Sequence, residues 1–164
     1  MQEAVLCDQL AGPLFLKGKA ECLLDWIDDE TGLRCKGLVD WISDHHPGVL
    51  FDLKTTRDAS PDGFGKSAWN FSYHTQDQFY RMGVEVMTGT APVGFVFVAV
   101  EKPNKPEDTP LPPQLYELGN LFTESAERKI REWLNRVQGA QLTDQWPCYE
   151  TGLKTLQHPS WARL

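Results

Sequence analysis

Residues 93–101, VGFVFVAVE, make the clearest apolar run in the sequence, and such a run is typical of a buried β-strand. A second run at residues 49–55, VLFDLKT, is apolar until it reaches Asp52, and Lys54 follows two places later. A buried charge is costly unless it is paired or serves a function. The fold must therefore cover two apolar strands, one of which ends in a carboxylate and an amine.

The segments around these two strands predict a strand meander followed by helices and further strands. We expect a short helix over 3–11, strands over 19–27 and 33–42, a loop over 57–66, a helix from Ser67 or Ser72 to Met87, an edge strand over 114–118, and a helix over 124–138 that begins at Thr123 and ends at Gly139. This order indicates an α/β fold, in which a mixed sheet of the restriction-endonuclease-like kind carries helices on both faces.

Composition favours one packed, cytoplasmic domain. The chain has 164 residues, 41% of them hydrophobic, and four widely spaced cysteines without a zinc-binding pattern. It lacks a secretory signal and any window close to the ~20 apolar residues that a membrane span needs. The formal net charge of −7 gives no support for holding DNA by electrostatic attraction alone.

Carboxylates and one lysine converge at the end of the 49–55 strand. Asp52 and Lys54 point to the same side, ~7 Å apart along the backbone, with the Leu53 carbonyl between them. If residues 44–48 form a turn, the preceding strand brings Asp40, which shares its parity with Leu38, beside Asp52. Two carboxylates and a carbonyl suit Mg²⁺, and the lysine can orient or deprotonate a nearby water. An ordinary ion pair at a strand end remains the alternative.

The helix after this strand carries a polar and aromatic stripe. Gln76 and Tyr80 are four residues apart and share one face with Tyr73. Such a stripe can cover the site and bind a phosphate group. A solvated face with an amphipathic tyrosine is the alternative.

Together the segments GLRCKGLVDWI, FDLKTT, YHTQDQFY, FVFVAVE and WPCYE…HPSWA resemble the nuclease domain of exonuclease VIII, the RecE-type exonucleases of prophages. That family belongs to the PD-(D/E)xK nuclease superfamily, with lambda exonuclease and RecB-type nucleases. The resemblance runs from about residue 19 to 162. It implies that Asp40 and Asp52 are the metal-binding acids, that the Leu53 carbonyl is a further ligand, and that Lys54 is the catalytic lysine.

The same resemblance assigns roles to the stripe and implies partners. Gln76 and Tyr80 match the family's QxxxY pair, which shapes the site and contacts the DNA end. Relatives use Mg²⁺ or Mn²⁺ to degrade the 5′ strand of duplex DNA, work beside a RecT-type single-strand annealing protein, and form homo-oligomeric rings. The expected function is therefore exonuclease action on duplex DNA ends, 5′ to 3′, in phage-type recombination. A structure-specific or single-strand nuclease, or an inactive remnant that binds DNA or a partner, is the alternative.

One departure concerns the metal site. The family has a further metal ligand, often a His, in an upstream helix, whereas the 39 residues before Asp40 contain no His. We therefore expect residues 1–164 to be a single domain that lacks the family's N-terminal extension. Glu21 is a candidate substitute ligand if it lies opposite Leu38; an exposed strand carboxylate is the other interpretation.

Further candidates for contact with DNA are less specific. Lys66 and Ser67 stand at an expected loop-helix junction, where backbone amides can hold phosphate, although an ordinary helix start explains them equally well. His74 lies about 200° around an ideal helix from Gln76 and is a candidate for packing or DNA contact. Trp133 and Trp161 are expected in the core or at an interface, not as platforms for base stacking.

Overall fold

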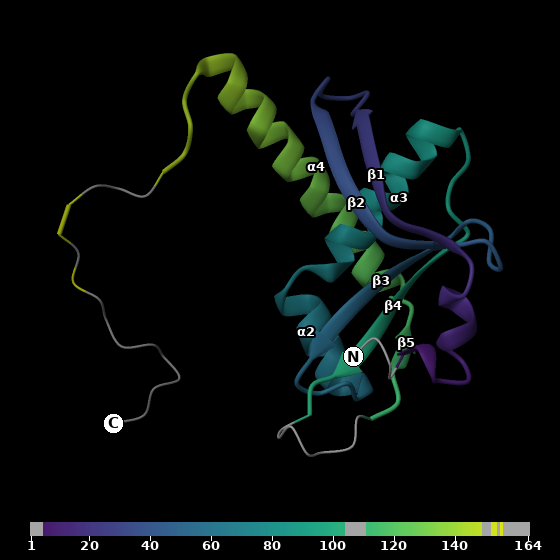
Figure 1. The fold of residues 1–164 in the computed structure, drawn as a ribbon. Helices are drawn as coiled ribbons and strands as arrows, with labels where there is room; N and C mark the ends of the chain where they lie inside the picture. The colour runs from purple at the N-terminus through teal and green to yellow at the C-terminus, as the bar shows by residue number, and fades with distance from the viewer. Residues whose placement is uncertain (1–4, 104–110, 149–151, 154, 156–164) are drawn as a thin grey trace.

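A computed structural model describes residues 5–103, 111–148, 152, 153 and 155 (Figure 1). Its elements, in chain order, are η1 (Gly12–Phe15), β1 (Gly18–Ile27), β2 (Arg34–Ser43), β3 (Val49–Thr56), α2 (Pro61–Asn70), α3 (Tyr73–Thr88), β4 (Gly94–Glu101), β5 (Gln114–Tyr116) and α4 (Asn120–Thr143). The strands of the described chain form one sheet in the order β1-β2-β3-β4-β5. β3 and β4 are parallel and the other neighbours antiparallel, because α2 and α3 cross from the end of β3 back to the start of β4.

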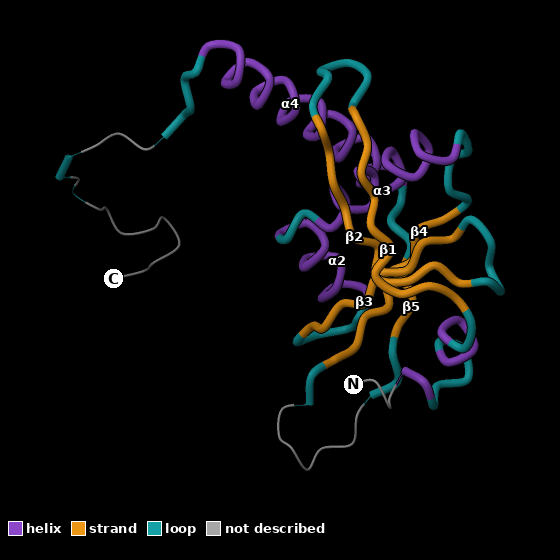
Figure 2. Tube along the Cα trace, turned by 45° about the horizontal axis from the view of Figure 1, so that its top comes forward, coloured by secondary structure: helices purple, strands orange, loops and turns teal. Residues whose placement is uncertain are grey.

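Alternate residues of β3 and β4 build two apolar layers on the two faces of the sheet. Leu50, Phe95 and Phe97 belong to the layer under α2 and α3. Phe51 and Val98 belong to the opposite layer, which the N-terminal segment with η1 covers. The α/β class and the mixed sheet are therefore confirmed. The helices are unequally divided between the two faces, since α2, α3 and α4 lie on one side (Figure 2) and the short η1 lies on the other.

β1 and β2 form a long hairpin that bends away from the rest of the sheet (Figure 1). β2 keeps only two registered pairs with β3, Trp41 with Phe51 and Ile42 with Leu50. Val39 packs in the layer under the helices while Trp41 packs in the opposite layer, so the alternation of sides breaks between them. Glu21, opposite this point on β1, has the left-handed φ of +50° that accompanies the break.

Among the element boundaries that differ from the sequence-based expectation, two concern the helices α2 and α4. Residues 57–66 were expected as a loop, but α2 begins at Pro61 because the Ser60 hydroxyl accepts a hydrogen bond from the Gly63 amide and proline suits the first helical turn. α4 begins after Gly119, with Thr123 inside its first turn, and runs through Gly139 to Thr143. A single glycine weakens a helix without ending it.

The tip of the β1–β2 hairpin is tied to α4. Arg131 of α4 donates to both carboxylate oxygens of Asp28, at 2.6 and 3.1 Å, and Asp28 is only 4% exposed. Gln138, two helical turns further on, donates to the backbone carbonyl of Thr31 at 2.7 Å. These contacts hold the hairpin against α4. The hairpin also forms one wall of the site described below. Over the part of the chain that is described, no helix combines the length and the apolar character needed to cross a bilayer.

Candidate active site

Asp52 lies at the centre of a polar cluster on the helix-covered side of β3. Its side chain is 1% exposed. Lys54 places its Nζ atom 2.5 Å from Oδ2, and Gln76 of α3 donates its Nε2 hydrogen to Oδ1, also at 2.5 Å. The strand alternation that aims Asp52 and Lys54 to one side was predicted from the sequence, and so was the approach of the Gln76 stripe. The structure brings all three together.

Asp40 joins this cluster where β2 separates from β3. The registered pairs of the two strands place Asp40 opposite Asp52 at the next position along. There the backbone ladder stops, and the Leu53 amide donates instead to Oδ2 of the Asp40 side chain at 2.9 Å. A carboxylate thus replaces a main-chain carbonyl as the partner of β3. The predicted neighbourhood of Asp40, Asp52 and Leu53 is confirmed. The expectation that Asp40 shares its side with Leu38 is wrong, because the alternation breaks here and Leu38 is 45% exposed.

One oxygen of Asp52, Oδ2, is fully buried beside the Lys54 ammonium. The two atoms lie 2.5 Å apart in a close ion pair, and no other group of the described chain donates to this oxygen. Burial raises the pKa of the Asp52 carboxyl and the charge of Asp40 raises it further, while Lys54 and Gln76 act in the opposite direction. A buried carboxylate beside a second carboxylate has the chemistry to bind a hard divalent cation.

Metal ligands beyond Asp40, Asp52 and the Leu53 carbonyl are few. Within the described ranges no group of three or more His, Cys, Asp or Glu side chains is arranged to hold a metal ion. This still fits Mg²⁺, which proteins commonly bind through one or two carboxylates together with substrate phosphate and water. Glu21 was expected opposite Leu38, but Leu38 pairs with Leu23, so Glu21 falls opposite Asp40. It remains a candidate ligand at the bend, with an exposed side chain.

Tyr73 supports the lysine of the cluster. The Nζ atom of Lys54 lies 4.8 Å from the centroid of the Tyr73 ring, over its face. The ring also stacks on Phe97, at 5.7 Å between centroids, which fixes it against the sheet. The sequence placed Tyr73 on the stripe of Gln76, which was expected to cover the site and bind a phosphate group, but its contact with Lys54 was not predicted.

Tyr80 lies one helical turn beyond Gln76 and rests on a glycine. A Cβ atom on Gly37 of β2 would come within 2.7 Å of the tyrosine ring, so the missing side chain makes room for it. The ring also lies near Phe95, with 6.3 Å between centroids. Tyr80 therefore forms the wall between α3 and the hairpin.

The weaker DNA-contact candidates lie elsewhere. Lys66 and Ser67 are inside α2, which begins at Pro61, so their amides do not form a helix N-terminus. His74 is 1% exposed, with Nδ1 3.4 Å from the Ala68 carbonyl and Nε2 3.1 Å from Lys129 Nζ. Burial lowers the pKa of His74. Its ring is a packing element here, and an exposed DNA contact is not available to it, whereas contact through the exposed Lys66 side chain stays a prediction.

The sequence matches, over residues 1–158, a family described as a PDDEXK-like domain of unknown function (DUF3799). The chain belongs to this family, which places it in the PD-(D/E)xK nuclease superfamily. No curated protein matches it.

Among solved structures, the chain is similar to the crystal structure of a "putative exonuclease" from Eubacterium rectale, at 15% sequence identity and a TM-score of 0.58. The match covers 85% of this chain and 56% of that one, so the chain spans little more than half of its structural relative. At this identity the likeness shows the shared fold, and the exonuclease VIII type stays a prediction.

Proposed function

We propose that this domain is a divalent-metal-dependent deoxyribonuclease that hydrolyses the phosphodiester bond beside Asp40, Asp52 and Lys54. The observation that carries the proposal is the buried carboxylate of Asp52, whose Oδ2 is paired with Lys54 and which lies beside a second acid, Asp40. An arrangement that raises the pKa of a buried acid does not stabilise the fold at neutral pH. Binding of a cation explains why the Asp52 carboxylate lies in an otherwise apolar layer.

Each residue of the chain has a distinct task in this proposal. Asp40, Asp52 and the Leu53 carbonyl hold Mg²⁺ or Mn²⁺, which when bound offsets the charge of the reacting phosphate. Gln76 fixes Oδ1 of Asp52, so Oδ2 stays turned toward Lys54. Lys54, 19% exposed, is the one basic group of this cluster, and it orients the attacking water or takes its proton.

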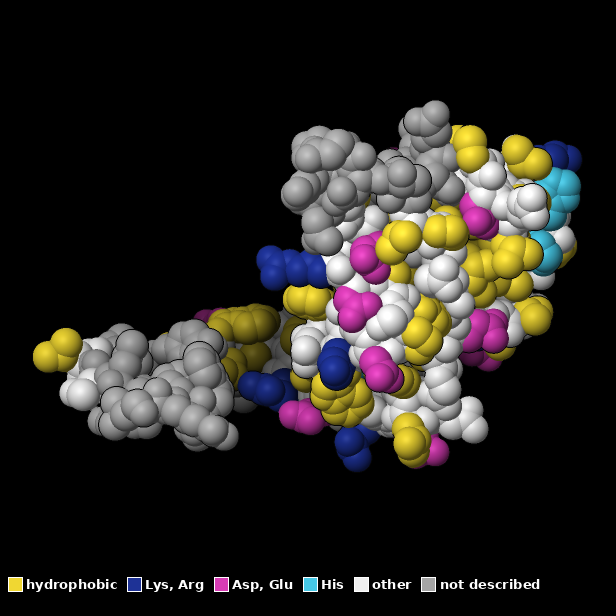
Figure 3. All heavy atoms as spheres, turned by 90° about the horizontal axis from the view of Figure 1, so that it is seen from below, with side chains coloured by type: hydrophobic (Ala, Val, Ile, Leu, Met, Phe, Trp, Pro, Cys, Tyr) yellow, Lys and Arg dark blue, Asp and Glu magenta, His cyan; other side chains and the backbone are white. Residues whose placement is uncertain are grey.

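We further propose the exonuclease VIII mode: removal of the 5′ strand from duplex DNA ends in phage-type recombination, beside a RecT-type annealing protein and in a homo-oligomeric ring. Support comes from the motif resemblance and from the name of the structural relative. The net charge is −7, and on the face that Figure 3 shows Asp and Glu side chains are interspersed among hydrophobic ones without a continuous basic patch. Local contacts at the site must therefore hold the DNA.

Three DNA substrates test this mode: an end-labelled linear duplex, a covalently closed circle and a single strand, each with Mg²⁺ or Mn²⁺. We expect the linear duplex to be shortened from its 5′ ends while the closed circle stays intact. Cleavage of the closed circle would contradict exonuclease action, and preference for the single strand would favour a single-strand nuclease on the same fold.

A second candidate function is an inactive domain that binds DNA or a recombination partner. It is motivated by the small set of protein ligands, two carboxylates and one carbonyl among the described residues. Calorimetric titration separates the two candidates. Binding of Mn²⁺ or Mg²⁺ in the millimolar range supports the nuclease, and its absence in the folded protein supports the inactive domain.

A further inference from the structure

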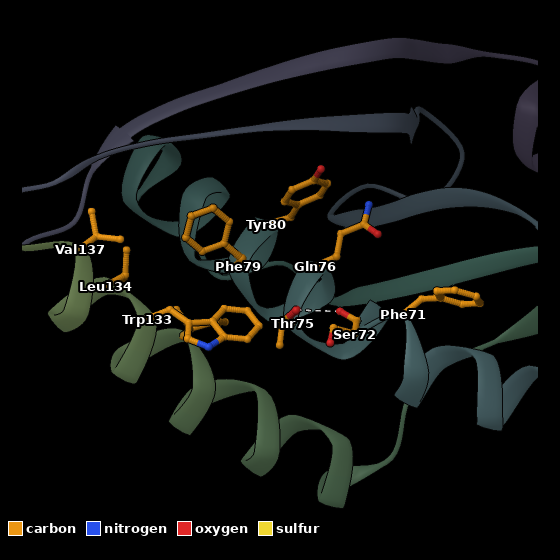
Figure 4. Close-up of a pocket in the computed structure, with 10 residues that line it drawn as sticks. Phe71, Ser72, Thr75, Gln76, Phe79, Tyr80, Trp133, Leu134 and Val137 are labelled. Atoms are coloured by element: carbon orange, nitrogen blue, oxygen red, sulfur yellow. Dashed lines mark hydrogen bonds between the residues drawn. The ribbon is translucent and has the colours of Figure 1, made fainter. Parts of the chain in front are cut away.

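An apolar cavity of about 510 Å³ lies between α3 and α4 (Figure 4), and Gln76 of the candidate active site is part of its wall. Its volume is within the ~300–1,000 Å³ of typical small-molecule pockets. Four aromatic side chains line it, two from α3, one from α4 and one from the α2–α3 junction: Phe79, Tyr80, Trp133 and Phe71. The remaining wall is partly polar and includes Ser72, Thr75 and Gln76.

Gln76 links the cavity to the catalytic cluster. It is one of the residues that line the cavity, and its side-chain amide donates to Oδ1 of Asp52 at 2.5 Å. The wall of the cavity at Gln76 is therefore in direct contact with the buried carboxylate. Tyr80 belongs to both places, since its ring lines the cavity and rests against Gly37.

The sequence predicted two alternatives for Trp133, because it falls on the same helical stripe as Ile130 and Leu134: a place in the core or at an interface. The structure excludes the core and does not test the interface. Ile130 is 3% exposed, but Trp133 is 43% exposed and turns its indole toward the cavity (Figure 4). A large aromatic face left open beside a polar reaction centre is suited to stacking.

Resting on the proposed function, we infer that this cavity binds one unstacked nucleobase of the DNA strand whose phosphate lies at Asp52 and Lys54. Aromatic faces stack any base without reading its sequence, and the polar wall offers hydrogen bonds to the base edges. The chain's charge of −7 makes contacts with phosphates a poor source of affinity. A neutral base in an apolar cavity supplies affinity that does not depend on positive charge.

Photo-crosslinking tests the assignment without relying on catalysis. A linear duplex with 5-iododeoxyuridine at its terminal positions is bound in EDTA, irradiated, and the attached peptide is identified by mass spectrometry. We expect attachment at Trp133, with the yield lost in Trp133→Ala and retained in Leu142→Ala, an exposed position on the same helix. Attachment only outside the cavity, or no measurable DNA binding by the folded wild type, would overturn the inference.

Affinity and its salt dependence give a second readout. One stacked base contributes about 5- to 150-fold in affinity, so Trp133→Ala should bind DNA weaker by a factor in this range, and Trp133→Phe by less. Because stacking releases no counterions, the slope of affinity against salt should be unchanged. Equal DNA binding by Trp133→Ala and Leu142→Ala would overturn the inference. A loss of self-association in Trp133→Ala with DNA binding intact would also overturn it, because the cavity would then be an interface between copies of this chain.

Hydrolysis of bis(p-nitrophenyl) phosphate separates this inference from the proposed function. That small phosphodiester reports on the proposed reaction without a DNA strand, so Leu142→Ala, outside the cavity, should hydrolyse it as fast as the wild type does. If the wild type does not hydrolyse it or DNA with Mg²⁺ or Mn²⁺, the nuclease proposal fails, and the crosslinking result still decides whether a base occupies the cavity.

Discussion

At the scale of single residues, the environment of Asp52 suits the binding of a cation but does not stabilise the fold at neutral pH. Its carboxylate is 1% exposed, and burial outweighs the favourable contacts from Lys54 and Gln76, so its pKa is raised. A raised carboxyl pKa means that the native state binds more protons than the unfolded chain does. The free energy of unfolding contributed by Asp52 therefore falls as the pH rises from the pKa of the unfolded carboxyl, about 3.9, through the higher native value.

Replacing Asp52 by Asn should therefore separate stability from activity. The asparagine oxygen still accepts the Gln76 hydrogen bond and the buried charge is removed, while the new NH2 group displaces the partly exposed Lys54 ammonium toward solvent. We therefore expect a higher melting temperature at pH 7 in EDTA and at least ~100-fold slower DNA cleavage. The gain in melting temperature should shrink as the pH approaches 4. Thermal melts at several pH values check this, and an Asn variant that melts below the wild type at pH 7 would contradict it.

Tyr73 should act on the rate through Lys54. Its ring face lies 4.8 Å from the ammonium, a cation–π contact of about 0.5–2 kcal/mol. Tyr73→Leu should lower kcat by roughly 2- to 30-fold with little change in KM, because the contact positions the lysine and does not bind DNA. Tyr73→Phe keeps the ring face and serves as the control. Equal losses in the Leu and Phe variants would assign the effect to the hydroxyl group instead.

At the scale of elements, the position of the β1–β2 hairpin depends on the ion pair between Asp28 at its tip and Arg131 of α4. The Arg131 hydrogen bonds lower the pKa of Asp28, with a further contribution from Thr31. Arg131→Met leaves the 4%-exposed Asp28 without its partner, and we expect a loss of about 3 kcal/mol, at the low end for buried pairs because Arg131 is 28% exposed. The double variant with Asp28→Asn should recover most of it. Urea unfolding checks both variants.

The stabilisation by the Asp28–Arg131 ion pair depends on pH with the opposite sign to the contribution of Asp52. A lowered carboxyl pKa stabilises the native state above the pKa of the unfolded carboxyl, about 3.9, and the stabilisation disappears as the pH falls through the native value. The destabilisation by Arg131→Met should therefore be full at pH 7 and shrink below pH 4. A constant difference across this range would show that packing, not charge, accounts for the loss.

The contact between β2 and α3 can be tested with a matched pair of glycines. Gly37→Ala would bring a methyl group within 2.7 Å of the Tyr80 ring, which should displace the ring, cost about 1–3 kcal/mol of stability and slow cleavage. Gly139→Ala meets nothing within 4 Å inside α4 and should stabilise the protein by up to ~1 kcal/mol. Chemical unfolding and DNA digestion of both variants check the prediction. A Gly37→Ala variant as stable and active as Gly139→Ala would contradict it.

Much of the site was predictable because it depends on periodicity. Strand alternation placed Asp52 with Lys54, the turn after β2 placed Asp40 opposite Asp52, and helical spacing placed Gln76 above them. The left-handed residue Glu21 and the break in alternation beside it were not predictable, since glutamate rarely adopts that conformation. Nor was the cavity, because Trp133 shares a helical stripe with residues that are buried. Which part of a stripe is covered depends on how α4 crosses α3, which is a tertiary property.

At the scale of the whole molecule, the chain is acidic, with a net charge of −7, whereas the substrate proposed for it, DNA, is a polyanion. The family match covers residues 1–158, and the structural relative shares the fold along 85% of this chain. The sheet core and the hairpin hold the carboxylates, the lysine and the aromatic cavity within one side of the molecule. Binding of DNA should therefore depend on this one side and on the divalent ion, and it should be lost when the ion and the aromatic contact are both removed.

The most direct test of the proposed nuclease activity and of the role of Lys54 is digestion of linear duplex DNA with Mg²⁺ or Mn²⁺. The proteins compared are the wild type, Lys54→Ala and Lys17→Ala. Lys17 is 73% exposed and pairs only loosely with Asp44, so its variant controls for the loss of one positive charge. We predict digestion by the wild type and by Lys17→Ala at similar rates, and a loss of at least ~100-fold in Lys54→Ala. Equal rates for all three folded proteins, or no digestion by the wild type with either ion, would contradict the account.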